Sequence, residues 1–310
     1  MRRMPVEMIK EVITEERKKT LKEALVEFYY SWIRPILKNR RAFIGSLILL
    51  MFISMATVGP LIVPLDLTTR WEQRFLPPSW EHPLGTDYAG RDIFQQIVHG
   101  SREVLTIAFL AAAYAILIAI SIGIVSGYLG GVVDAFLMGI TDIFLTIPSF
   151  PVMLIIAVTV RVADPFSFAA ILAIWMWAGL ARSIRAQVRS LREREFIEAA
   201  KVLGMSTRHI VFKEILPNIA PYITIYFIRM MKGAITASVG IMFLGVVPLS
   251  IVHWGVMMNL AMFQYGAVYV PEGIFYALSP LMAIVLLEYG AICFASGVEE
   301  IVNPRLKTYE

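Results

Sequence analysis

The chain has 310 residues, of which 58% are hydrophobic and 17% are charged, and its formal net charge is +4. Soluble domains carry about 25% charged residues, and here the apolar residues come in long blocks, so a string of ordinary soluble domains is excluded. The single cysteine, Cys293, excludes an intrachain disulfide, and the four histidines lack metal-ligand spacing.

Residues 1–41 are charged and have an amphipathic pattern, VEMIKEVITEERKKTLKEALVEF. They predict a helical N-terminal segment that lies along the cytoplasmic surface of the membrane. The alternative is a solvated charged tail. Arg2 and Arg3 are followed by acidic and amphipathic sequence and not by a short apolar core, so this start is not that of a signal peptide.

Six segments are apolar enough, over about 20 residues, to cross a bilayer. In lipid the backbone must satisfy its own hydrogen bonds, so helices are expected, and the fold class is all-α: a polytopic membrane protein with six transmembrane helices. The predicted spans are residues 42–63, 104–125, 135–160, 166–181, 222–247 and 275–298. Residues 104–298 would form a five-helix core after the first helix.

Prolines and glycines mark two of these spans. Pro148 and Pro151 are predicted to break the third span, because a proline cannot donate a backbone hydrogen bond. Gly240 and Gly245 are predicted to let helices approach closely near the end of the fifth span.

The placement of Lys and Arg predicts the orientation. Of the 28 basic residues, eleven lie in the first 41 residues, eight in residues 182–220 and two in the tail, 299–310. The opposite loops hold five. Both termini and residues 182–220 are therefore expected in the cytoplasm, and residues 64–103 form an extracytoplasmic loop.

The cytoplasmic stretch 196–218 reads FIEAAKVLGMSTRHIVFKEILPN and predicts a helix–turn–helix. Gly204 is expected to end the first helix in the left-handed conformation, and Ser206 or Thr207 to cap the second helix, 208–216. Pro217 is expected to end that helix before the fifth span. Helical spacing places four apolar residues of the first helix on one face: Phe196, Ala199, Ala200 and Leu203.

Glu198-Ala199-Ala200, then Gly204, then Leu216-Pro217 resembles the EAA loop of ABC importer permeases. In that family the loop forms a coupling helix that sits in a groove of the ATP-binding subunit. The resemblance implies a type I ABC importer fold with a cytoplasmic coupling helix, although Glu214 stands where Ile or His is usual. The residues it implies for coupling to the ATPase are Glu198, Ala199, Ala200, Gly204, Met205, Ser206, Leu216 and Pro217.

Four further stretches resemble the dipeptide/oligopeptide/nickel type of this family, in the second permease of the pair. They are HPLGTDYAGRD at 82–92, GYLGGVVDAFLMGITDIFLTIPSFP at 127–151, FLGVVPLSIVHWG at 243–255 and NPRLK at 303–307. The resemblance covers roughly residues 43–307 and rests on the motifs together.

The resemblance also implies partners. These are a homologous permease, giving a heterodimer, two cytosolic ATP-binding subunits and an extracellular solute-binding protein, in the inner (cell) membrane lipid bilayer and with no nucleic acid. The chain lacks the phosphate loop G-x-x-x-x-G-K-[ST]. We therefore expect a non-catalytic subunit that binds no cofactor, with ATP and Mg held by the partner ATPases.

Arg229 and Lys232 lie three residues apart in the fifth span, where an unpaired charge is costly. By residue counting Asp142 and Glu288 lie at similar depth. We expect the two bases to pair with these two acids in a buried cluster. The alternative is that one base faces the translocation pathway.

The substrate is left open between a short peptide and an oligosaccharide. Many peptide-type relatives carry an acidic residue where this chain has Ser238, and three tryptophans, Trp175, Trp177 and Trp254, are candidates for a sugar path or an interfacial belt. No ligand cluster favours nickel. Two rival classes are an ATP-independent secondary transporter, for which no inverted repeat is visible, and an intramembrane enzyme, for which Asp142 lacks a twin.

Overall fold

The computed structural model describes residues 26, 29–160, 162, 164–247 and 250–302. Most of the amphipathic segment 1–41 and the tail motif 303–307 lie outside these residues. Of that segment, the structure shows a short helical entry, η1 (Tyr29–Ile33) and α3 (Arg34–Lys38). In the described part every regular element is a helix, and the one β-bridge joins Thr86 to Asp92.

Five helices are long and apolar enough to cross a membrane. α4 (Arg40–Thr57), α6 (Ile93–Leu129) and α9 (Pro165–Arg192) are three of them. The fourth is a continuous helix, Thr207–Phe243, composed of α11 (Thr207–His209), η3 (Ile210–Ile215) and α12 (Leu216–Phe243). The fifth joins η6 (Pro271–Gly273) to α14 (Ile274–Val302).

The predicted third span is a bent pair of helices. α7 (Gly131–Thr146) and α8 (Ser149–Thr159) meet at 87°, so the chain has up to six spans if this pair counts as one. Pro148 causes the break, since it precedes α8 as its N-cap residue. Pro151 was predicted to break the span as well, but it lies in the first turn of α8, where its missing N–H is not needed.

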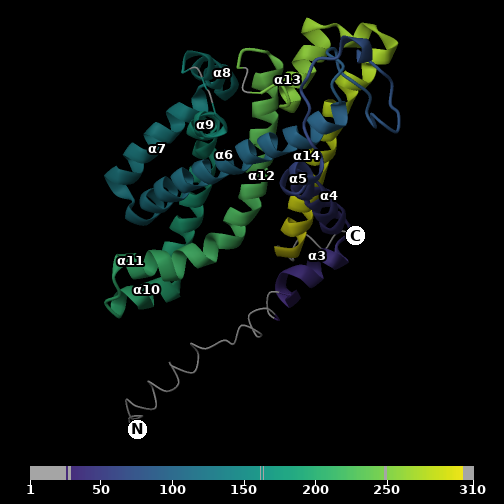
Figure 1. Cartoon of the computed structure of the whole chain (residues 1–310). Coiled ribbons are helices and arrows are strands. Elements are labelled where there is room, and N and C mark those ends of the chain that lie inside the picture. Colours follow the sequence, from purple (N-terminus) through teal and green to yellow (C-terminus); the bar gives the residue numbers. More distant parts are fainter. Residues whose placement is uncertain (1–25, 27–28, 161, 163, 248–249, 303–310) are drawn as a thin grey trace.

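Short elements fill the two ends of the bundle. α10 (Glu195–Val202) and α11 lie at one end, which we call the α10 end (Figure 1). The opposite end, the α13 end, carries α13 (Trp254–Asn259) followed by η4 (Leu260–Gln264) and η5 (Ala267–Tyr269). α5 (Gly59–Ile62) and η2 (Trp71–Gln73) complete the elements.

α6 is the centre of the core and packs along α9, with α12 and α4 against its other sides. Glycines bring α6 and α9 together: a Cβ on Gly123 would lie 2.8 Å from the carbonyl oxygen of Ala181. α4 rests on α14 in the same way, because a Cβ on Gly45 would lie 2.3 Å from the backbone nitrogen of Phe294. Small residues at such contacts are the usual way that membrane helices gain packing contact.

Two helices, α6 and α9, extend into polar sequence outside their predicted spans. α6 begins at Ile93, since Asp92 caps it by accepting a hydrogen bond from the Gln95 N–H at 2.9 Å, so the loop predicted as 64–103 ends at Asp92. α9 continues well past Ala181 to Arg192. In both cases the additional turns contain polar residues. These residues lower the mean hydropathy of the segment, so the predicted span stops before the helix does.

Candidate functional site

The coupling segment, residues 195–217, begins with α10, whose first turn carries Glu195 and Glu198. Acidic residues there are favourable beside the positive end of the helix dipole. Gly204 ends the helix with φ of +72°, and the N–H groups of Gly204 and Met205 donate to the carbonyls of Lys201 and Ala200. This is a Schellman motif, and the predicted left-handed end is confirmed.

Ser206 begins the following helix. Its Oγ accepts a hydrogen bond from the N–H of His209 at 3.3 Å, so of the two predicted caps the structure uses Ser206 and not Thr207. The two helices of the coupling segment thus meet at a turn of fixed shape.

α10 buries one side against its surroundings. Ile197 and Ala200 are buried, and they share a hydrophobic cluster with Ile210 and Ile215. Of the four apolar residues predicted to share one face, Ala200 is buried, whereas Phe196, Ala199 and Leu203 are exposed. Contact with η3 and α9 decides which side of the helix is covered.

Apolar side chains therefore project from the α10 end. Val202 is 87% exposed, Leu203 is 74% exposed and Phe212 is 58% exposed. Beside them a hollow of about 370 Å³ is lined by Ser206, Arg208, His209, Phe212 and Lys213. Leu216 is half-buried, and Glu198, Gly204 and Met205 are exposed with the rest of the turn.

Pro217 does not end the helix, contrary to prediction. η3, a π-helix with wider turns than an α-helix, ends two residues before Pro217, and the helix is continuous from Thr207 to Phe243. A proline ring clashes with the carbonyl four residues earlier in a regular helix, and a wider turn relieves that clash. The carbonyl of Glu214 accepts from the Asn218 Nδ2 at 2.6 Å.

The predicted pairing of Arg229 and Lys232 with Asp142 and Glu288 is wrong. Arg229 donates to Glu299 at 2.5 Å, and Glu288 accepts instead from the hydroxyl of Thr236 at 2.5 Å. Asp142 pairs with Arg182 of α9. Among the described residues Lys232 has no acidic partner within 4 Å. Arg229 and Glu288 thus meet partners at different heights along α12 and α14, and counting residues cannot tell which helices face each other.

These charges lie on open faces of the single chain. The Arg229 side chain is 48% exposed and the Asp142 side chain is 59% exposed. We call Arg229, Thr236, Glu288 and Glu299 the polar face. A groove of about 380 Å³ between α9 and α12 leads to it, lined by Met176, Gly179, Leu180, Ser183, Tyr226, Arg229 and Met230.

Ser238 and two of the tryptophans belong to the packed core. Ser238 is fully buried, and its hydroxyl donates to the carbonyl of Ile235 at 3.0 Å. Trp254 is fully buried and donates to the carbonyl of Ile97 at 3.1 Å, and Trp177 is 4% exposed. Trp175 is half-buried and packs on Phe144. Trp177 and Trp254 therefore line neither a sugar path nor an interfacial belt.

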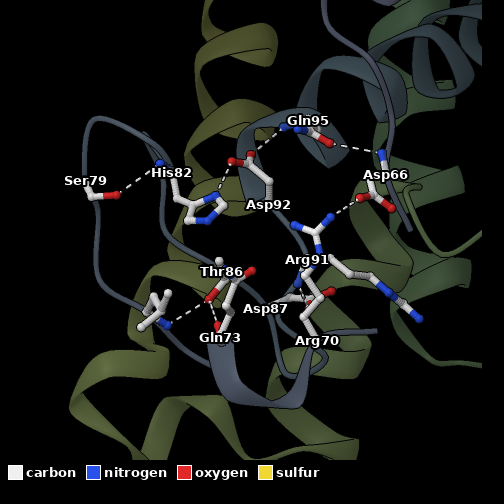
Figure 2. Close-up of polar contacts among 11 residues, drawn as sticks. Asp66, Arg70, Gln73, Ser79, His82, Thr86, Asp87, Arg91, Asp92 and Gln95 are labelled. Carbon is white, nitrogen blue, oxygen red and sulfur yellow. Dashed lines mark hydrogen bonds and ion pairs between the residues drawn. The ribbon is translucent and has the colours of Figure 1, made fainter. Parts of the chain in front are cut away.

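The stretch 82–92 organises the loop at the α13 end (Figure 2). One carboxylate oxygen of Asp87 accepts from the N–H groups of Ala89 and Arg91 at 2.8 and 2.9 Å, and the other accepts from Gln96 at 3.0 Å. These hydrogen bonds lower the pKa of Asp87, but burial raises it by more, so the pKa lies above its ordinary value. His82 Nδ1 lies 2.8 Å from Asp92 Oδ2, and both residues are buried.

This loop is also fastened to its surroundings. Asp66 accepts from Arg70 and its own N–H donates to the Gln95 side chain at 3.0 Å, as Figure 2 shows. The ring of Tyr88 stacks on Tyr265. The sequence marked the motif but not these roles, because the contacts depend on how the loop closes. Within the described residues, no group of three or more His, Cys, Asp or Glu could hold a metal ion.

Comparison with known proteins gives the family. Residues 119–308 match the family described as binding-protein-dependent transport system inner membrane component, and residues 30–78 match the N-terminal TM domain of oligopeptide transport permease C. The dipeptide transport system permease protein DppC of Alkalihalophilus pseudofirmus is 30% identical over 278 residues, 89% of each chain. The oligopeptide transport system permease protein OppC of Mycobacterium tuberculosis is 35% identical over 218 residues, 69% of this chain and 74% of the relative. With its long apolar helices, the chain therefore belongs to the binding-protein-dependent inner membrane components and is a multi-pass permease of the ABC importer kind.

Proposed function

We propose that this chain is the second permease of a heterodimer that imports short peptides across the cell membrane, driven by ATP hydrolysis in two separate cytosolic subunits. It forms half of the translocation pathway, receives substrate from an extracellular binding protein and itself performs no catalysis. ATP and Mg are bound by the partners. Both termini and the α10 end face the cytoplasm, as the excess of Lys and Arg on that side supports.

The observation that carries this proposal is the exposed apolar turn of the coupling segment. Val202 and Leu203 project from a turn fixed by a Schellman motif and a serine cap, and Phe212 projects from η3, which follows. Exposed apolar side chains held on a rigid element are typical of a docking surface for a partner protein. The hollow beside them, with Arg208 and Lys213, offers polar contacts at its rim.

Peptide transport is supported by the polar face and by the names of the relatives, which are dipeptide and oligopeptide permeases. Arg229, Glu288 and Glu299 present both signs of charge, which suits a zwitterionic peptide better than a neutral sugar. Charges at membrane depth face a pathway or a partner and not lipid. Two of the three tryptophans considered for a sugar path, Trp177 and Trp254, are buried in the core, which favours a peptide over an oligosaccharide.

The test is uptake by the complete complex in proteoliposomes, with its binding protein and both ATPases. We expect ATP-dependent uptake of labelled dipeptides or short oligopeptides and none of sugar oligomers. Uptake without ATP would overturn the coupling part, and uptake of sugars alone would overturn the substrate part.

The role of the polar face is tested by Arg229→Met. Its pair with Glu299 is exposed within the chain and is worth about 0–1 kcal/mol, so the complex should assemble. Peptide uptake should fall at least tenfold. Loss of assembly instead would show that Arg229 is structural.

A further inference from the structure

An apolar groove crosses the side of the bundle formed by α4, α6 and α12. Its volume is about 750 Å³, and its lining includes Thr57, Leu61, Arg102, Phe109, Phe227 and Met231. Several of these side chains are open to the surroundings: Leu61 is 85% exposed and Phe109 is 54% exposed. The groove is independent of the coupling segment and shares no residue with the polar face.

The groove faces away from the polar face. In an α-helix, residues two positions apart along the chain are rotated by about 200° from each other. Phe227 and Met231, each two positions from Arg229, therefore point to the opposite side of α12. Phe227 also meets Phe109 of α6 edge to face, with ring centroids 5.5 Å apart, which closes the floor of the groove. If the polar face meets the pathway, this groove meets lipid.

One charged side chain stands at the mouth of the groove. Arg102 lies three residues after His99, whose Nε2 contacts the carbonyl of Val63 at 2.8 Å, just where α5 ends. It is therefore near the level at which α4 and α5 leave the apolar layer. Arg102 is exposed, and among the described residues no carboxylate oxygen lies within 4 Å of it.

We propose that the groove binds one phospholipid, with an acyl chain along Phe109, Phe227 and Met231 and the headgroup phosphate on Arg102. A guanidinium matches a phosphate with two parallel hydrogen bonds, and its charge is complementary to the anion. The apolar wall below would take the chain of the same molecule. The groove lies toward the α13 end, which the distribution of Lys and Arg assigns to the outer leaflet.

The experiment is native mass spectrometry of the full-length chain released from detergent, with dioleoyl phosphatidylglycerol as the probe. Dioleoylglycerol, which lacks the phosphate, and glycerol phosphate, which lacks the chains, are the two comparison ligands. We expect one retained phosphatidylglycerol, weaker retention of dioleoylglycerol and no retention of glycerol phosphate. Retention of glycerol phosphate as strong as that of the lipid would overturn the proposal in favour of a free anion.

Variants separate the two halves of the site. Arg102→Ala should weaken phosphatidylglycerol binding about five- to tenfold, and Arg102→Lys should recover most of it. Thr106→Phe, which fills the groove, should lower the retention of phosphatidylglycerol and dioleoylglycerol alike. Arg74→Ala, an exposed cation outside the groove, is the matched control.

Two further results would overturn the proposal. In the first, Arg102→Ala retains as much phosphatidylglycerol as Arg74→Ala. In the second, the lipid is displaced when the chain is purified with its partner permease, which would make the groove a protein interface. Folding of each variant is checked by its thermal unfolding, and Arg102→Lys provides a charge-preserving form if Arg102→Ala is unstable.

Discussion

The two ends of the bundle have turns of similar backbone geometry but differ in the side chains around them. At the α13 end, the loop of residues 64–92 is held by hydrogen bonds of the buried side chains Asp87, His82 and Asp92. At the α10 end, the coupling segment has a turn of similar backbone geometry, but Val202 and Leu203 are left in the open. The α13 end is thus organised by buried polar contacts within the chain, whereas the turn at the α10 end presents apolar side chains that burial against another protein would stabilise.

The glycines of the two ends sharpen this contrast and give the largest expected effect. Gly90 and Gly204 have nearly the same φ, +75° and +72°, but a Cβ on Gly90 would lie 2.0 Å from the Arg70 carbonyl oxygen, whereas one on Gly204 would meet nothing within 4 Å. We expect Gly90→Ala to destabilise the protein by about 3 kcal/mol or more and Gly204→Ala by about 1 kcal/mol. Thermal unfolding in detergent measures both, and equal losses would contradict the contrast.

A second prediction concerns the open side of the comparison. The double change Val202→Ser and Leu203→Ser should leave the stability of the chain within about 0.5 kcal/mol, because both side chains are exposed. Binding to the ATPase should weaken about 30-fold or more, as at an interface hot spot. Co-purification of the ATPase measures this. Tyr269→Ser, a change of a similarly exposed residue at the other end, is the control and should retain the ATPase.

Helix caps give a third, smaller difference. Asp92→Ala removes both the cap of α6 and the partner of buried His82, and should cost about 2 kcal/mol. Ser206→Ala removes a longer, exposed cap bond in the coupling segment and should cost about 0.5 kcal/mol. Unfolding midpoints of the two variants compare them. A larger loss for Ser206→Ala would show that the coupling turn is the more constrained end.

The smallest effect is a pH dependence at Asp87. Its pKa is raised above the ordinary 3.8 by burial, so the folded protein binds this proton more tightly than the unfolded chain. The linked stability is present at low pH and is lost as the pH rises above 3.8. Asp87→Asn should therefore flatten the fall in unfolding temperature over that range. A steeper fall in the variant would mean that hydrogen bonds outweigh burial at this carboxylate.

Local signals carried over well from sequence to structure. Gly204 and Ser206 act within a few residues of themselves, and their roles at the helix ends were predicted correctly. Five of six spans were found as single helices, because a long apolar stretch leaves few other choices in lipid.

Contacts between distant segments did not carry over. The partner of Arg229 is Glu299, not Asp142 or Glu288, because helix rotation and facing are set by packing that hydropathy does not encode. For the same reason the spacing of apolar residues in α10 did not predict which side of the helix is buried. Pro217 was misread because a wide turn relieves its clash, and only the neighbouring backbone reveals such a turn.

The unbroken passage through Pro217 has a mechanical consequence. Thr207–Phe243 is 37 residues long, or about 55 Å at 1.5 Å per residue. The helix need not be straight, because η3 and the internal Pro221 are both features at which helices bend. Its hydrogen-bonded backbone nevertheless runs without a loop from the turn at Gly204 into the bundle. A displacement of that turn by a partner would therefore be passed directly to the residues of α12.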